Sequence, residues 1–214
     1  MTIDRRYLPA ASRDFLLPLY DPLMSVLGFR HALDPLVAQA GLEPGHVILD
    51  IGCGTGTLAI FVKQRFPSIE IIGADPDPKA LARAKAKAAR AGVAVRFDRA
   101  FGDALGYGDA TFDRVFSSMM LHHVPKAEKI ALLAEVRRVL KPGGRLELLD
   151  FTGGARSFLA QVLHGRQASD AMDSRLLARL AEAGLVGAHR VATRQTLVGA
   201  IGYYQAAAPA KERS

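Results

Sequence analysis

Short apolar runs alternate with amphipathic stretches through the middle of the chain. Apolar runs of strand length lie at 46–51, 69–75, 93–99, 112–118 and 144–151. Segments with helical periodicity separate them at 57–66, 78–91 and 126–140. This alternation predicts an α/β fold in which helices cover both faces of a mostly parallel sheet.

Prolines and glycines mark several of these boundaries. Pro78 stands where a first helical turn would begin, and Gly92 follows the last periodic residue of the same segment. The stretch "KPGG" at 141–144 is expected to end the helix before it. We therefore expect the middle of the chain to follow the pattern closely.

The two flanking segments are less regular. Residues 12–40 predict two or three short helices interrupted by prolines, and we expect 1–44 to form a helical cap over a core at 45–205. A helix at 173–184 precedes two β-like runs, which predict an antiparallel hairpin on the sheet edge. The tail at 206–214 is expected to fray. Without repeats or a low-complexity linker, the chain predicts a single domain.

Composition narrows the class of protein. The chain has 214 residues, of which 50% are hydrophobic, so one large buried core is expected. Its only cysteine, Cys53, excludes an intrachain disulfide and favours the cytoplasm. The first 20 residues lack the layout of a signal peptide, and no apolar stretch of about 18 residues predicts a transmembrane segment. The sequence does not indicate an oligomeric state.

The net charge of +7 raises the question of an acidic partner such as nucleic acid. In the most basic segment, helical spacing places four cations on one face, namely Lys79, Arg83, Lys87 and Arg90. We interpret this face as the solvated side of a packed helix. No aromatic residues that could stack on bases are interleaved with it, which argues against a nucleic-acid partner.

The stretch "VILDIGCGTGTLAI" at 47–60 predicts a tight turn at the carboxyl end of the first strand, where ligands bind in doubly wound folds. Its glycines are Gly52, Gly54 and Gly56. A dinucleotide site would have a third small residue at position 57, where this chain has Thr57. Asp50 adds a negative charge, so the turn favours a cationic amine over a pyrophosphate.

Acidic residues also follow the next two strands. Asp75 lies nineteen residues after Gly56, close to the spacing of an acid that accepts hydrogen bonds from ribose hydroxyls. Asp103 is placed to accept a hydrogen bond from the exocyclic amine of adenine, and the Ala104 N–H to donate one to the ring. Each acid alone could be a helix cap or a solubility residue. Three acids after three successive strands indicate one adenosyl ligand.

The ordered motifs "LDIGCGTG", "GADPDP", "GDALGYGDATFDRVFSSMMLHHV" and "VLKPGGRLELLDF" resemble those of class I S-adenosylmethionine-dependent methyltransferases. With "YDPLMSVLG", they are most similar to the small-molecule enzymes of ubiquinone and menaquinone biosynthesis. The resemblance implies a Rossmann-like, doubly wound sheet of seven strands whose last two form the antiparallel hairpin. It also implies S-adenosyl-L-methionine as the cofactor and S-adenosyl-L-homocysteine as its product.

The same resemblance implies roles for particular residues. Asp50 would lie near the methionine amine, with the glycine turn beneath the methionine portion. Asp75, followed by Pro76, would bind the ribose, and Asp103 would bind the adenine. The backbone around Ser117 would complete the methionine site, and Tyr20 of the cap would cover the cofactor.

Catalytic chemistry is expected just beyond the fourth strand. If the acceptor is a phenol or hydroquinone it must lose a proton, and His122 or His123 is placed to take it. Alternatively, one or both histidines pack and hydrogen-bond the loop, and of the two His123 better fits that structural role. Apolar residues that predict a hydrophobic acceptor pocket, or ordinary core, are Met119, Met120, Phe151 and Phe158.

The favoured hypothesis is methyl transfer to oxygen or carbon of a small, apolar or aromatic acceptor. The net charge keeps an RNA methyltransferase open, and a non-catalytic cofactor-binding protein or an NAD dehydrogenase are further alternatives. The sequence "SSMML" after strand four argues against amino methylation of a nucleobase. No His, Cys or acidic cluster has metal-ligand spacing, so no metal is expected, and Cys53 is interpreted as a packed residue.

Overall fold

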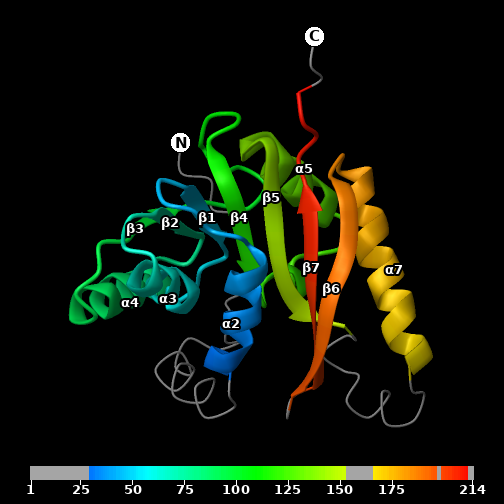
Figure 1. Ribbon diagram of the computed structural model, residues 1–214, viewed down its shortest axis with the longest axis horizontal. Coiled ribbons are helices and arrows are strands. Elements are labelled where there is room, and N and C mark those ends of the chain that lie inside the picture. The colour runs from blue at the N-terminus through cyan, green and yellow to red at the C-terminus, as the bar shows by residue number, and fades with distance from the viewer. Residues whose placement is uncertain (1–28, 153–165, 197–198, 212–214) are drawn as a thin grey trace.

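The computed structural model describes residues 29–152, 166–196 and 199–211, which form one seven-stranded sheet (Figure 1). Its order is β3-β2-β1-β4-β5-β7-β6. The strands are β1 (Val47–Ile51), β2 (Glu70–Asp75), β3 (Arg96–Arg99), β4 (Phe112–Ser118), β5 (Leu140–Phe151), β6 (Val186–Thr196) and β7 (Gly199–Ala207). β7 runs antiparallel to both β5 and β6, and the other pairs are parallel. The predicted Rossmann-like fold with its terminal hairpin is confirmed.

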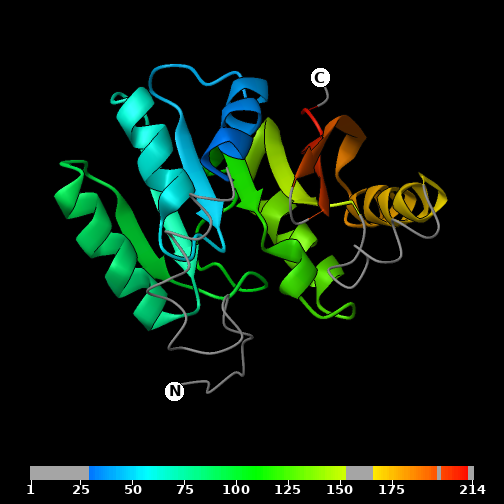
Figure 2. The same cartoon turned by 90° about the horizontal axis from the view of Figure 1, so that it is seen from below.

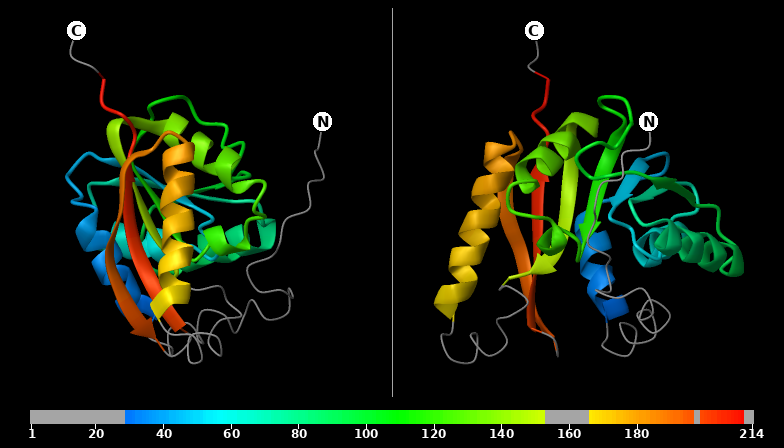
Figure 3. Two further views of the ribbon diagram at one scale, coloured as in Figure 1. Left: turned by 90° about the vertical axis from the view of Figure 1, so that its right-hand side faces the viewer. Right: turned by 180° about the vertical axis from the view of Figure 1, so that it is seen from behind.

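Helices cover both faces of the sheet (Figure 2). They are α2 (Phe29–Gln39), α3 (Thr57–Arg65), α4 (Pro78–Arg90), α5 (Lys129–Val139) and α7 (Arg166–Glu182). Buried side chains of α2, α3 and α4 form one apolar cluster with the sheet, and those of α5 and α7 form a second on the opposite face. The left view of Figure 3 shows α7 alongside the β6–β7 hairpin.

The chain reverses its direction across the sheet between β1 and β4. It first builds β1, β2 and β3 outward, and then returns to place β4 on the other side of β1. At this junction Ile51 of β1 pairs with Ser117 of β4. In doubly wound folds such a switch point opens a crevice at the carboxyl ends of the two strands. The glycine turn therefore lies where a ligand is expected.

Helix α2 packs on a face of the sheet, with Leu33 and Leu36 fully buried. The expectation that prolines interrupt this segment is wrong for Pro35, which lies inside the helix. A helical proline leaves the carbonyl four residues earlier without its usual N–H donor. Here the Arg194 guanidinium donates to that carbonyl, His31 O, at 3.0 Å. The rest of the predicted cap, residues 1–28, lies outside the described residues.

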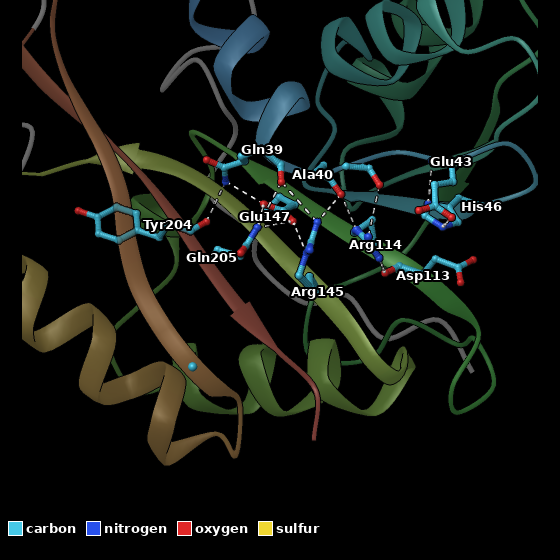
Figure 4. Close-up of polar contacts among 12 residues, drawn as sticks. Gln39, Ala40, Glu43, His46, Asp113, Arg114, Arg145, Glu147, Tyr204 and Gln205 are labelled. Carbon is cyan, nitrogen blue, oxygen red and sulfur yellow. Dashed lines mark hydrogen bonds and ion pairs between the residues drawn. The ribbon is translucent and has the colours of Figure 1, made fainter. Parts of the chain in front are cut away.

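A buried polar network joins the end of α2 to β5 and β7 (Figure 4). The fully buried Glu147 carboxylate accepts hydrogen bonds from Gln39 Nε2 at 2.8 Å, Gln205 Nε2 at 3.1 Å and Arg145 Nε at 3.2 Å. Burial raises the pKa of Glu147, and these donors oppose the increase. Arg145 also donates to Ala40 O, so the network closes the carboxyl end of the helix.

Several predicted boundaries are wrong: the helix predicted from 173 starts at Arg166, and two strand boundaries also differ. The tail predicted from residue 206 begins too early, because β7 continues through Ala207 and the buried Ala208 exchanges backbone hydrogen bonds with Gly143 and Gly144. The helix before "KPGG" ends as predicted, because α5 stops at Val139, but the strand predicted from 144 already starts at Leu140. In both places backbone pairing with a neighbouring strand extends the element, and local residue preference does not encode that pairing.

Candidate functional site

The glycine turn links β1 to α3 through three left-handed residues, with φ of 68° at Gly52, 51° at Gly54 and 74° at Gly56. Residues with a Cβ rarely adopt this conformation. The N–H groups of Gly52 and Cys53 both donate to Ala74 O of β2, at 2.8 and 3.1 Å, which anchors the turn to the sheet. A Cβ on Gly54 would meet no atom of the described chain within 4 Å, so the backbone there is open to a ligand.

Asp75, the last residue of β2, braces this turn. Its Oδ2 accepts a hydrogen bond from Gly54 N at 2.8 Å, and its Oδ1 accepts one from Asp77 N at 2.9 Å. Burial raises the pKa of Asp75, although both amide donors oppose the increase. A carboxylate oxygen has two lone pairs, so each oxygen can accept one further hydrogen bond from a ligand hydroxyl.

Asp50 is a buried acid with unused hydrogen-bonding capacity. It is 1% exposed, and its Oδ2 has no hydrogen-bond partner among the residues that the structure describes. Burial, assisted by the charge of Asp75, raises the pKa of Asp50 to about 8, while the Ala59 N–H acts in the opposite direction. Ser117 Oγ at the end of β4 is also buried and unpartnered within the described ranges. Such atoms are costly to bury unless a ligand or water binds them.

Lys87 of α4 reaches back to the glycine turn. Its Nζ donates to Thr55 Oγ1 at 3.1 Å and to Thr57 Oγ1 at 2.8 Å. The sequence interpretation of Lys87 as part of a solvated stripe is therefore wrong. Gly56, the N-cap of α3, has no side chain that could cap the helix. Lys87 therefore holds the two residues that flank Gly56, Thr55 and Thr57, from a neighbouring helix.

Pro76, predicted beside the ribose, lies after β2, and the residues predicted to bind adenine, Asp103 and Ala104, lie in the loop after β3. Asp103 is half-buried there, and Pro76 O accepts a hydrogen bond from Arg99 Nε at 3.2 Å. The Ala104 N–H already donates to Phe101 O at 3.0 Å, so a contact with adenine would require this bond to be exchanged. Tyr20 lies outside the described residues.

The loop after β4 lies directly against the turn. Met119 has a positive φ of 54°, which is uncommon for a residue other than glycine. Residues in such conformations cluster at functional sites. A Cβ on Gly52 would lie 2.2 Å from Met120 Cγ, so Met120 fills the space that the glycine leaves. Met119 packs into the core, and Phe158 lies outside the described residues. Met120 therefore borders the turn, whereas Met119 belongs to the core.

His122 is held by Asp150 of β5, which the sequence analysis missed. Its Nδ1 lies 2.7 Å from Asp150 Oδ1, and its backbone N–H donates to Asp150 Oδ2 at 2.9 Å. The His122 ring also contacts Phe151, with 5.2 Å between the ring centroids. One signal was available: like Asp50 and Asp75, Asp150 is an acid at the carboxyl end of a core strand.

His123 lies beside this pair, with its ring centroid 4.0 Å from that of His122. Burial lowers the pKa of His123, and the neighbouring His122 adds to the decrease. The structure gives His122 a carboxylate partner, whereas the His123 ring has none among the described residues. The two histidines thus have different surroundings.

Other kinds of site find no support in the parts of the chain that are described. There, no group of three or more His, Cys, Asp or Glu side chains is placed to hold a metal ion. Cys53 is buried, and burial raises the pKa of its thiol well above the usual value, which disfavours a thiolate nucleophile. None of the described helices is long and apolar enough to cross a membrane.

Comparison with known families and proteins identifies similar chains. The family described as "Methyltransferase domain" matches residues 48–144. The demethylmenaquinone methyltransferase of Thermus thermophilus is 39% identical over 143 residues, covering 64% of this chain and 62% of that protein. The 27-O-demethylrifamycin SV methyltransferase of Amycolatopsis mediterranei is 38% identical over 120 residues, covering 55% and 43%. The chain thus spans about three-fifths or less of the length of these relatives.

Solved structures support the same fold. YcgJ from Bacillus subtilis superposes with a TM-score of 0.68 at 20% identity, covering 84% of this chain and 99% of that one. A putative methyltransferase from Bacillus halodurans gives 0.64 at 21% identity, covering 83% and 98%. At these identities the likeness concerns the fold alone.

Proposed function

We propose that the chain is a class I S-adenosylmethionine-dependent methyltransferase, which transfers a methyl group from S-adenosyl-L-methionine to oxygen or carbon of a small, apolar or aromatic acceptor. The observation that carries this proposal is Asp50. A fully buried carboxylate with an unpartnered oxygen, next to an open glycine turn, fits a ligand that brings a cation and no phosphate.

The residues of the turn fit the other parts of such a ligand. Asp50 would bind the ammonium of the methionine portion, and the Ser117 hydroxyl would add a polar contact beside it. Asp75 would accept hydrogen bonds from the ribose hydroxyls, with Pro76 adjoining. Asp103 would face the adenine amine. The G-x-G-x-G spacing and Asp50 both disfavour the pyrophosphate of NAD.

When bound, the sulfonium cofactor supplies a methyl group activated for in-line displacement. The protein contributes alignment and the exclusion of water. Met120, packed on Gly52, and Phe151, in contact with His122, are the apolar residues that would border the acceptor. The similar proteins named above act on a quinone and a rifamycin, which supports a small ring-containing acceptor. We place this reaction in the cytoplasm.

An RNA methyltransferase is the second candidate, favoured by the net charge of +7. Lys87 points inward to Thr55 and Thr57, which removes one cation from the stripe that would track a phosphate backbone. Steeply salt-dependent binding to RNA would promote this candidate. A cofactor-binding protein without turnover would bind the cofactor and methylate no acceptor.

Isothermal titration calorimetry tests the proposal. S-adenosyl-L-homocysteine and NAD are titrated separately into the full chain. We expect saturable binding of S-adenosyl-L-homocysteine and none of NAD; the reverse pattern would falsify the cofactor assignment. Methyl transfer is then followed with radiolabelled S-adenosyl-L-methionine and an extract of the native host, with the labelled product identified by mass spectrometry.

A further inference from the structure

Asp150 makes three short hydrogen bonds, and two of them go to His122. Oδ2 accepts from His122 N at 2.9 Å, and Oδ1 lies 2.7 Å from His122 Nδ1. Oδ1 also accepts from Phe151 N at 2.8 Å. The carboxylate side chain is 6% exposed and the imidazole 21% exposed. A buried acid therefore fixes both the backbone and the ring of a histidine that solvent or a ligand can reach.

This contact determines which nitrogen of the ring is basic. An ionised carboxylate accepts hydrogen bonds and cannot donate them, so the proton between the two groups lies on Nδ1. In a neutral imidazole the other nitrogen, Nε2, is then the acceptor. Within 29–152, 166–196 and 199–211 the structure gives Nε2 no hydrogen-bond partner. The free lone pair is available to a substrate.

The pair also lies beside the proposed cofactor turn. His122 follows Met120 by two residues, and Met120 fills the space over Gly52. Asp150 comes directly after Leu149, which pairs with Ser118 at the end of β4. The pair is therefore at the carboxyl edge of the sheet, on the same edge as Asp50.

Charged and titratable groups approach the pair from several packed elements. They are His123 of the same loop, Lys129 of α5, with Arg179 of α7 next to it, and Tyr204 of β7. Burial and the charges of His122 and Lys129 lower the pKa of His123, and that of Asp150 acts in the opposite direction. Asp150 is the group among them that is hydrogen-bonded to His122.

We propose that Asp150 is a positioning residue that holds His122 ready to accept a proton from an O–H group, so that the methyl acceptor is a phenol, a hydroquinone or an alcohol. This inference rests on the proposed function and narrows its acceptor. The proton passes from the acceptor oxygen to His122 Nε2, giving an imidazolium stabilised by Asp150. The freed electron pair of the acceptor forms the bond to the methyl carbon, and the pair of the broken S–C bond remains on sulfur.

The choice between oxygen and ring carbon follows from the acceptor. In an alcohol the new bond is O–CH₃. In a hydroquinone the same deprotonation also activates the adjacent ring carbon, which then loses its own proton to restore the aromatic ring. Both outcomes require the O–H proton to leave first or during attack.

Nuclear magnetic resonance of protein labelled with ¹⁵N-histidine tests the tautomer without any acceptor. We expect neutral His122 to be protonated at Nδ1 in the wild type, and Asp150→Asn to weaken this preference. Asp113→Asn is the matched control, because Asp113 also accepts a backbone N–H, from Val47, and a side-chain cation, Lys141, at the opposite end of β4. Nε2 protonation of His122 in the wild type would overturn the proposal.

Steady-state kinetics provide the second test, with catechol and 1,4-naphthohydroquinone as acceptor probes. His122→Ala is expected to lower kcat by about 10²- to 10⁴-fold, the usual contribution of a general base. Asp150→Asn should lower kcat by a smaller factor and shift the acidic limb of the pH profile, whereas Asp113→Asn leaves both unchanged. The affinity for S-adenosyl-L-homocysteine should stay within about twofold in all three variants, since none touches the cofactor turn.

The outcomes separate the two proposals. If the wild type does not bind S-adenosyl-L-homocysteine, the proposed function itself is contradicted. Intact binding with methyl transfer to neither probe contradicts the O–H acceptor class. Full activity of His122→Ala, or a larger loss in His123→Ala than in His122→Ala, contradicts the assignment of the base.

Discussion

Cofactor binding should release a proton from Asp50. The buried carboxyl has a pKa of about 8, so about nine in ten molecules carry it protonated at pH 7. An ammonium group placed against Oδ2 favours the ionised form and returns the pKa toward its ordinary range. Binding of S-adenosyl-L-homocysteine at pH 7 should therefore release close to one proton.

The same coupling makes the affinity depend on pH. Ionising Asp50 at pH 7 costs about 1.4 kcal/mol, which corresponds to one pH unit below its pKa. This cost falls as the pH approaches the pKa, so the affinity should rise about fivefold between pH 7 and pH 8. Asp75 also has a raised pKa, so its ionisation should likewise increase the affinity as the pH rises.

Calorimetry in buffers of different ionisation enthalpy measures the number of protons exchanged. Wild-type protein should release nearly one proton per ligand at pH 7, and Asp50→Asn should release markedly less. The matched control, Asp109→Asn, removes an exposed acid paired with Arg138 and should behave as the wild type. No proton release by the wild type, or equal release by Asp50→Asn, would refute the placement of the ligand amine.

Three further changes probe the turn. Asp75→Ala should weaken S-adenosyl-L-homocysteine binding by about 1–3 kcal/mol in calorimetry through lost hydrogen bonds, and unchanged affinity would exclude the ribose contact. Lys87→Met should weaken it by about threefold to tenfold by releasing the turn, whereas the exposed Lys85→Met should not; equal affinities would make Lys87 irrelevant to the site. Gly56→Ala should lower the free energy of unfolding in urea by about 1–3 kcal/mol, because φ is 74° and the new Cβ would lie 2.8 Å from Phe97 Cζ. Gly92→Ala, with φ of 66° and open space, should cost less, and an equal cost would rule out the steric overlap.

The stability of the folded protein without ligand should also depend on pH through Asp50. Because its folded pKa of about 8 lies above the ordinary 3.8, the folded protein binds more protons than the unfolded chain between these values. The stabilisation associated with protonated Asp50 is complete below the lower value and is lost as the pH rises through the upper one. Urea unfolding should therefore show Asp50→Asn losing less stability than the wild type between pH 6 and pH 9; parallel curves would contradict the raised pKa.

Local sequence signals located the core of the fold accurately. Pro78 and Asp77 start α4 as a proline and a capping carboxylate should, and β4 has the predicted bounds of 112–118. The sequence also placed Asp50 and Asp75 at the carboxyl ends of strands beside the glycine turn, and the structure has them there. These features depend on neighbours in the sequence, which is why the sequence alone was sufficient.

Contacts between distant segments were not predictable in the same way. Lys87 meets Thr55 across 32 positions of sequence, and Asp150 meets His122 across 28. Helical spacing predicted a solvated Lys87, because periodicity indicates the face of the helix on which a residue lies but not how far its long side chain reaches. Arg194 likewise compensates Pro35 of α2 from β6, so a helix forms where the proline predicted a break.

A crystal structure of the chain with S-adenosyl-L-homocysteine tests the central claim most directly. The account predicts the nucleoside at the turn formed by 52–56, its ammonium bound by Asp50 directly or through one water, and its ribose hydroxyls on Asp75. The account is contradicted if this turn stays empty at saturating ligand, or if the ligand binds with its ribose away from Asp75.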